Sequence, residues 1–142
     1  MDRKKQIAAL PVRKDKKGTL KVLLVTSRQT GRLVIPKGWP WPGIKDHKAA
    51  AEEAREEAGI VGKAHKEPLG SYDYDKRMPS GTVPVRVKVF LLEVEEELDE
   101  WRESEERKRV WFTPTKAAAA VDEPELAELI LQLKERRRAA AR

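Results

Sequence analysis

The stretch that decides the fold is residues 38–60, GWPWPGIKDHKAAAEEAREEAGI. It opens with a segment too rich in Pro and Gly to form the interior of a helix or strand. From Asp46 to Ala58 the composition changes to Ala, Glu, Lys and Arg, which favour helix, and Asp46 is a plausible N-cap. Gly59 stands where a glycine commonly ends a helix. The stretch therefore predicts a loop followed by a helix over residues 46–58.

Apolar segments on both sides of this helix predict strands. The expected strands are residues 7–12, 20–26, 33–35, 69–74, 83–94 and 110–112. The acidic stretch 93–106 predicts a loop. A short helix is expected over 114–121, and Pro124 opens a longer one. Strands on both sides of a central helix, with helices closing the chain, predict an α+β fold in which a sheet lies between helices.

Length and composition narrow the class of protein. A chain of 142 residues suits one domain, expected over residues 1–142. The absence of Cys excludes disulfides, thiol nucleophiles and zinc–thiolate sites, and two His make a histidine-rich metal site a poor expectation. No apolar run approaches the roughly 20 residues that span a bilayer, and the first residues do not resemble a signal peptide. A cytoplasmic location is expected, with no membrane partner.

Charge is unevenly distributed along the chain. Residues 1–48 carry 13 Lys/Arg and 3 Asp/Glu, whereas residues 49–142 carry 17 and 21, within a net charge of +6. A basic N-terminal third is typical of proteins that meet a polyanion: a nucleic acid, a phosphorylated metabolite or an acidic membrane surface. It is also compatible with an ordinary solvated surface.

The central helix carries four glutamates on one stripe. At 3.6 residues per turn they spread over about 140° of the helix surface. They are Glu52, Glu53, Glu56 and Glu57. Like charges at i,i+4 destabilise a helix, so an external cation is a natural counter-charge, and several carboxylates suit Mg²⁺ or Mn²⁺. The alternative is a solvated, glutamate-rich helix face.

At this point the segment resembles the Nudix hydrolases, whose signature is G-x5-E-x7-R-E-U-x-E-E-x-G-U, with U a bulky apolar residue. The spacing places the first glycine at Gly38 and keeps the E-x-x-E-E core as Glu53, Glu56 and Glu57. The resemblance implies the family's fold, an α/β/α sandwich with a mixed central sheet, the helix of the signature and a C-terminal helix.

The same resemblance implies roles for individual residues. Glu53 and Glu57 would be metal ligands, joined by the carbonyl of Lys37, and Glu56 would be a further ligand and the base for the attacking water. Two signature positions differ, because Ile44 replaces the first glutamate and Glu52 replaces the arginine that orients a catalytic glutamate in the family. Arg55, one turn along, is a candidate substitute for that arginine.

Among Nudix branches, the chain is most similar to the diphosphoinositol polyphosphate phosphohydrolases, which also cleave diadenosine polyphosphates. The similar segments are residues 3–9, 23–28, 32–38 and 107–112. Residues that would bind substrate by this resemblance are Lys4, Lys5, Thr26, Ser27, Arg28, Gly38, Arg86 and Arg107. Several Lys and Arg suit a substrate with many phosphates.

The loop after Gly38 departs from that branch, which has a glycine cluster there. Here Trp39 and Trp41 flank Pro40. The two indoles could stack on a ring of the substrate, or they could pin the loop to its own domain.

The expected function is therefore a Mg²⁺- or Mn²⁺-dependent pyrophosphohydrolase. It would cleave a phosphoanhydride in a phosphate-rich small molecule, with diphosphoinositol polyphosphates or diadenosine polyphosphates as the expected substrates. Alternatives within the family are ADP-ribose, nucleoside triphosphates and RNA 5′ ends. A further alternative is a weakly catalytic module that binds polyphosphate or RNA.

Overall fold

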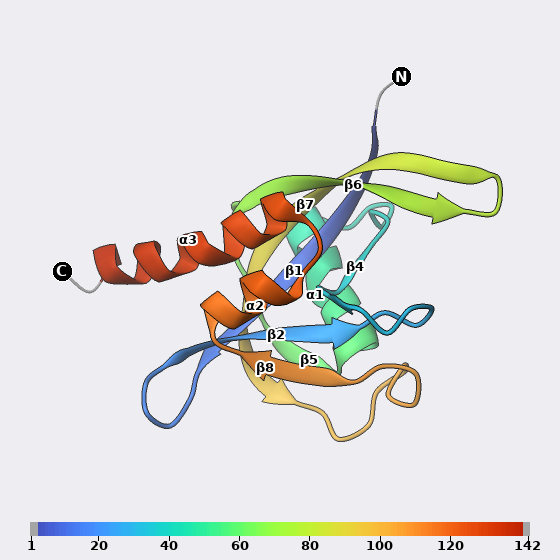
Figure 1. The fold of residues 1–142 in the computed structure, drawn as a ribbon. Helices are drawn as coiled ribbons and strands as arrows, with labels where there is room; N and C mark the ends of the chain where they lie inside the picture. Colours follow the sequence, from blue (N-terminus) through green and yellow to red (C-terminus); the bar gives the residue numbers. More distant parts are fainter. Residues whose placement is uncertain (1–2, 141–142) are drawn as a thin grey trace.

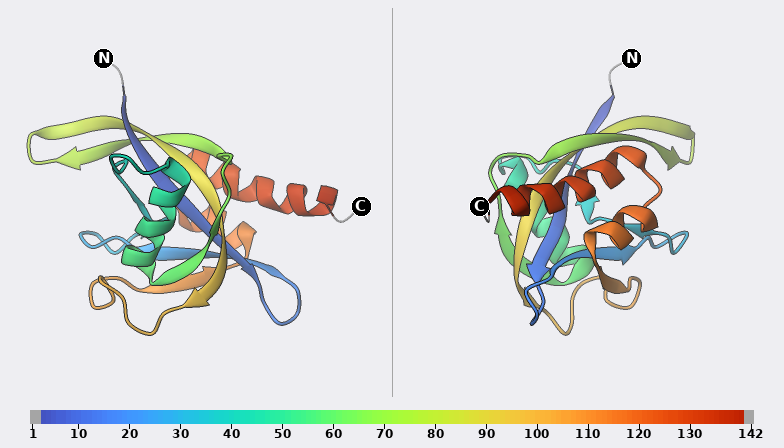
Figure 2. Two further views of the ribbon diagram at one scale, coloured as in Figure 1. Left: turned by 180° about the vertical axis from the view of Figure 1, so that it is seen from behind. Right: turned by 60° about the vertical axis from the view of Figure 1, so that its left-hand side comes forward.

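The computed structural model describes residues 3–140, with side chains over residues 3–133. In this range a mixed sheet of eight strands lies between one helix on one face and two helices on the other (Figure 1, Figure 2). The helices are α1 (Asp46–Ala58), α2 (Pro114–Ala120) and α3 (Pro124–Ala140). The strands are β1 (Lys4–Lys14), β2 (Leu20–Thr26), β3 (Leu33–Val34), β4 (Lys37–Gly38), β5 (Ile60–Ala64), β6 (Gly70–Met78), β7 (Gly81–Glu97) and β8 (Arg109–Phe112). The α/β/α sandwich expected from the sequence is confirmed.

Two long strands form the centre of the sheet. β1 pairs in parallel with β7 from Lys4 opposite Val85 to Val12 opposite Glu93. β7 also pairs antiparallel with β5 and β6, while β1 pairs antiparallel with β2 and the short β4. The pairing with β1 brings β4 beside the middle of the sheet, and the loop that follows β4 leads into α1.

Each face of the sheet has its own hydrophobic core. Side chains of α2 and α3, including Leu126 and Ile130, pack with Leu10 and Val87 on one face. Alanines of α1 pack with residues such as Ile7 on the other. Figure 2 shows α1 and α3 on opposite sides of the sheet in both views. The two cores fix α1 relative to the sheet, which matters because α1 carries the signature glutamates.

Two local expectations were wrong, and one strand was missed. The acidic run expected as a loop is strand as far as Glu97, because β7 continues through it in pairing with β5. Lys45, not Asp46, is the N-cap residue, and Asp46 begins the helix. Strand β5 follows α1 directly and was not expected. Its β-branched start, Ile60-Val61, is the signal that could have indicated it.

Gly59 ends α1 as expected. It adopts φ 63°, and its N–H donates to the carbonyls of Ala54 and Arg55. Within the described residues, none of the helices is long and apolar enough to cross a bilayer.

We expect Ile130→Ala to destabilise the protein by about 2–5 kcal/mol, because its side chain is fully buried between α3 and the sheet. Leu131→Ala is the matched control, since the neighbouring side chain is 44% exposed and its loss is expected to cost within about 0.5 kcal/mol. Urea unfolding followed by circular dichroism measures both changes. Equal losses for the two variants would contradict the packing described for α3.

Candidate active site

Small side chains bring α1 close to the sheet. Ala49, Ala50, Ala54 and Ala58 are all fully buried against β1 and its neighbours. With this face turned inward, Glu53 and Glu57 lie one turn apart at the edge of the contact, whereas Glu52 is exposed. The four glutamates of the stripe therefore meet different surroundings.

The carboxylate of Glu53 is confined on two sides. It lies directly against Gly38, where a Cβ atom would overlap its carboxylate atoms. The indole Nε1 of Trp41 donates a hydrogen bond to Oε1 of Glu53 at 3.1 Å. A side chain at the first glycine of the signature would thus displace this carboxylate from its position against β4.

Glu57 is a buried acid in a network of charges. It is 6% exposed, and burial together with a hydrogen bond to Glu53 raises its pKa to about 9, although the nearby Arg107 acts in the opposite direction. Nη2 of Arg107 lies 3.5 Å from Oε1 of Glu57. The same guanidinium binds Glu103 at 2.8 Å and the carbonyl of Thr26 at 3.1 Å. Arg107 thereby joins α1 to the end of β2 and to the loop before β8.

The C-terminal end of α1 is held by two residues that sequence reasoning missed. Trp101 Nε1 donates to the carbonyl of Glu57 at 3.0 Å, and its ring lies over Gly59. The guanidinium of Arg109 donates to the carbonyls of Ala58 and Gly59 at 3.0 Å and stacks on Trp101 at 4.2 Å. These contacts satisfy carbonyls at the helix end and fix the turn that carries Glu57. The signature does not include either residue.

The side chain of Lys37 points toward β6. Its Nζ lies 5.4 Å from the centroid of the Tyr74 ring on β6. Burial lowers the pKa of Lys37 to about 8, while Glu57 and Glu123 favour its charged form. Its backbone carbonyl, the atom expected to serve as a metal ligand, belongs to the strand residue just before Gly38.

The donor set fits one Mg²⁺ or Mn²⁺ ion. Among the side chains described, residues 3–133, no cluster of three Asp, Glu or His is close enough to hold a metal by itself. Mg²⁺ does not require one, because it is usually held by one or two carboxylates, with water and substrate phosphates completing its shell. Glu53 and Glu57 supply two hydrogen-bonded carboxyl groups, and a cation between them would favour the charged form of Glu57 that burial disfavours.

Glu56, the residue expected to be the base, has different hydrogen-bond partners from Glu53 and Glu57. Its Oε1 accepts a hydrogen bond from Arg102 at 3.3 Å, and its backbone carbonyl accepts one from the N–H of Glu103. The partners of Glu56 thus come from the segment between β7 and β8.

Four of the residues expected to bind substrate lie around the end of β2, beside Glu57. Thr26 Oγ1 accepts from the N–H of Lys108 at 2.9 Å, and Ser27 Oγ bonds Thr30 Oγ1 at 2.6 Å. Arg28 lies 3.5 Å from Glu103 and 3.4 Å from Glu106. Together with Arg107, these groups form one contiguous region, but each already has a partner within the protein.

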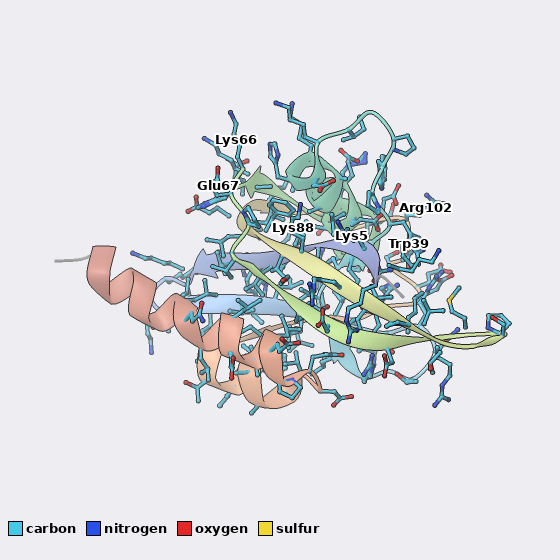
Figure 3. All side chains as sticks on the ribbon, turned by 90° about the horizontal axis from the view of Figure 1, so that it is seen from above. Lys5, Trp39, Lys66, Glu67, Lys88 and Arg102 are labelled. Atoms are coloured by element: carbon cyan, nitrogen blue, oxygen red, sulfur yellow. The ribbon has the colours of Figure 1, made fainter. Side chains whose placement is uncertain are left out.

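Of the other four expected substrate residues, Gly38 lies on β4 against Glu53, and Lys4, Lys5 and Arg86 lie on β1 and β7. Lys5 and Arg86 face each other across these strands and line a cavity of about 410 Å³ with Lys88, whose side chain is labelled beside that of Lys5 in Figure 3. The glutamates of α1 do not line it, although Asp46 at the start of the helix does. Arg86 binds Asp73 through two hydrogen bonds of 2.8 and 3.1 Å. Lys4 is an exposed neighbour in β1, where alternate side chains point to opposite faces.

The two tryptophans of the loop after β4 differ in their surroundings. Trp41 is partly buried and packs against the core under α1, whereas Trp39, labelled in Figure 3, is 43% exposed. Trp41 therefore holds the loop against its own domain, as one of the two hypotheses for this loop states.

Arg55, the candidate substitute for the signature arginine, is exposed. The hydrogen-bond donor to Glu53 is instead Trp41.

The NUDIX domain model matches residues 3–133, which is nearly the whole described chain. The chain belongs to the Nudix family.

This Nudix chain is similar in sequence to curated hydrolases from plants and mammals. It is 38% identical over 108 residues to Nudix hydrolase 12, mitochondrial, from Arabidopsis thaliana, covering 69% of this chain and 50% of the relative. It is 33% identical over 135 residues to diphosphoinositol polyphosphate phosphohydrolase 3-beta from Bos taurus, covering 92% of this chain and 78% of the relative. The chain spans about half the length of the first plant relatives that it matches.

Solved structures confirm the fold of this Nudix chain. An Ap4A hydrolase from C. elegans superposes with a TM-score of 0.64 at 21% identity, over 94% of this chain and 98% of that one. RenU, a Nudix hydrolase from M. smegmatis, also gives 0.64, at 17% identity over 98% and 89%. At these identities the likeness concerns the fold alone.

We expect the metal-free protein to lose stability as pH rises from about 4.5 to about 9, because folded Glu57 holds its proton more tightly than the unfolded chain does. The stabilising contribution of protonated Glu57 is fully present below the ordinary glutamate pKa of 4.5. It is lost as the pH rises through the pKa of about 9 that Glu57 has in the folded protein. Glu57→Gln keeps a neutral side chain and is expected to flatten this decline. Urea midpoints measured with a chelator between pH 5 and 9 test it, and an unchanged decline in Glu57→Gln would contradict the raised pKa.

Proposed function

We propose that this protein is a metal-dependent pyrophosphohydrolase that cleaves a phosphoanhydride bond in a diphosphate linked to another moiety. The observation that carries the proposal is the pair of hydrogen-bonded carboxyl groups, Glu53 and Glu57, beside the backbone of Gly38. Membership of the Nudix family, whose members named above include hydrolases, supports it.

Different residues of the site would bind the metal ion and accept the proton of the attacking water. Glu53, Glu57 and the carbonyl of Lys37 would hold Mg²⁺ or Mn²⁺, with Glu56 as a further ligand. The bound ion supplies positive charge that offsets the negative charge of the substrate phosphates. Glu56 would accept the proton of the attacking water, and its ion pair with Arg102 would orient its carboxylate until then.

Diphosphoinositol polyphosphates and diadenosine polyphosphates are the substrates that we favour. The similarity to diphosphoinositol polyphosphate phosphohydrolases from mouse and cattle supports the first, and the C. elegans Ap4A hydrolase suggests the second through its fold. Lys4, Lys5, Arg28 and Arg107 would bind the flanking phosphates, helped by Thr26, Ser27, Gly38 and Arg86. Because the arginines have acidic partners, substrate phosphates would compete with Glu103, Glu106 and Asp73 for them.

A binding module of low activity is the second candidate. It is favoured by the two signature departures, because Glu52 and Ile44 are both exposed in the structure and neither contributes a donor or ligand to the carboxylate pair. Such a module would bind polyphosphate or RNA without metal-stimulated turnover. A cytoplasmic location also belongs to the proposal, although several plant relatives are named mitochondrial.

A substrate panel tests the choice of substrate. We expect a diphosphoinositol phosphate or a diadenosine polyphosphate to be hydrolysed faster than ADP-ribose, nucleoside triphosphates or 5′-triphosphorylated RNA, with either Mg²⁺ or Mn²⁺. The released phosphates are identified by ³¹P NMR, which shows the bond that breaks. A clear preference for ADP-ribose would overturn the favoured substrate class, and tight ligand binding without turnover would support the binding module.

We expect Glu56→Gln to lower kcat by at least about 100-fold, because a positioned general base typically contributes about 10²–10⁴ in rate. The amide keeps the size of the side chain and can still contact Arg102, so the fold should persist. Glu52→Gln is the control on the same helix, since its exposed side chain faces solvent. Near-normal kcat in Glu56→Gln, with thermal unfolding unchanged, would remove Glu56 from the role of base.

A further inference from the structure

A carboxylate that must hold a cation in a fixed place needs a donor that fixes its own orientation. Glu53 has neutral backbone on one side and the carboxyl group of Glu57 on another, and neither supplies a positive charge. The residue immediately before it, Glu52, is an exposed acid and donates nothing. The one hydrogen bond that the described structure gives to the Glu53 carboxylate from outside α1 comes from Trp41 Nε1, at 3.1 Å.

The loop that presents Trp41 is rigid by its sequence. Pro40 and Pro42 flank the tryptophan and restrict the backbone on both sides. The next turn is closed by the N–H of Ile44, which donates to the carbonyl of Trp41 at 3.1 Å, with Gly43 at φ 75°. Proline followed by a glycine of positive φ is the pattern of a type II turn. The indole is partly buried against the core under α1, so its N–H is aimed before any ligand arrives.

We propose that Trp41 is a positioning residue that holds the Glu53 carboxylate in the orientation needed to bind the divalent cation. This inference rests on the proposed function, because it assigns Glu53 to the metal site. The indole N–H only donates and does not titrate. It therefore orients the carboxylate without itself gaining or losing a proton.

The test compares two tryptophans of one loop. Trp41→Phe keeps an aromatic ring of similar shape in the core but removes the N–H, whereas Trp39→Phe changes an exposed ring that contacts no carboxylate in the described structure. Mn²⁺ affinity, measured from the EPR signal of the free ion, is expected to fall roughly 10- to 100-fold in Trp41→Phe and to stay within about threefold in Trp39→Phe. No substrate is needed for this measurement.

A purely structural role for Trp41 predicts a different result. In that case Trp41→Phe would lower the thermal midpoint and leave the Mn²⁺ affinity of the folded protein unchanged, which would overturn the proposal. An equal loss of affinity in Trp39→Phe would overturn it as well. With substrate, the positioning role predicts a higher metal concentration at half-maximal rate, and KM for the substrate at saturating metal within about threefold of the unsubstituted protein.

A second measurement uses the unsubstituted protein, in case Trp41→Phe does not fold. The four indole N–H signals in a ¹⁵N–¹H spectrum are assigned from Trp39→Phe, Trp101→Phe and Trp111→Phe, each of which removes one. Titration with Mg²⁺ is expected to shift the Trp41 signal and to leave that of Trp39 in place. A Trp41 signal that does not move at saturating Mg²⁺ would overturn the proposal.

Failure of this inference can be told apart from failure of the proposed function. If the unsubstituted protein binds Mn²⁺ and hydrolyses a phosphoanhydride while Trp41→Phe binds Mn²⁺ equally well, only the role of Trp41 is wrong. If the unsubstituted protein neither binds Mn²⁺ nor shows metal-dependent hydrolysis, the proposed function itself is wrong.

Discussion

Two acidic side chains meet at a place where water is largely excluded, and much of the local structure serves to tolerate that contact. Glu57 is buried beside Glu53, and two carboxylates so close cannot both be charged without a nearby positive charge. Arg107 supplies part of it and ties α1 to the end of β2. Trp101 and Arg109 bind carbonyls at the C-terminal end of α1 and so hold the turn that carries Glu57.

Burying Glu57 beside Glu53 costs folding free energy, which is consistent with a site that binds a ligand rather than one that stabilises the fold. A buried acid in a purely structural role is normally satisfied by hydrogen bonds and paired charges. Here Glu57 is satisfied in the protonated form, and a cation could replace the proton. Alanines on the inner face of α1 bring the helix close enough to the sheet for Gly38 to touch Glu53.

Composition suggests that the basic residues of the N-terminal third are free to bind an anion, but in the structure several of them form ion pairs. A basic N-terminal third indicated free positive charge, but Arg13, Arg28 and Arg32 all lie within ion-pair distance of acids from distant parts of the chain. Lys5 and Lys88 line a cavity, and Lys88 binds Asp46 at the start of α1. Net charge per segment therefore overestimates the charge that is available to a polyanion.

Sequence reasoning predicted the sandwich, the helix over residues 46–58 and its glycine end, because periodicity and caps are local signals. It did not predict Trp101 or Arg109, because they approach α1 from more than forty residues away in the chain, one from a loop and one from the start of β8, and belong to no motif. The same limit applies to Trp41, whose partner is visible only once the loop is folded onto α1. Spacing identified which glutamates matter, but their burial, which separates Glu57 from Glu52, depends on packing.

The parallel pairing of β1 with β7 also has a consequence for how the chain acquires its structure. Residues paired in this ladder are about eighty positions apart, as with Lys4 and Val85, so the contacts at the centre of the sheet are among the least local in the molecule. Pairings of this kind slow folding, because a long loop must close before they form. During synthesis, β1 lacks its central neighbour until β7 has been made. The alanine face of α1, formed earlier in the chain, must wait for the same event before its half of the core is complete.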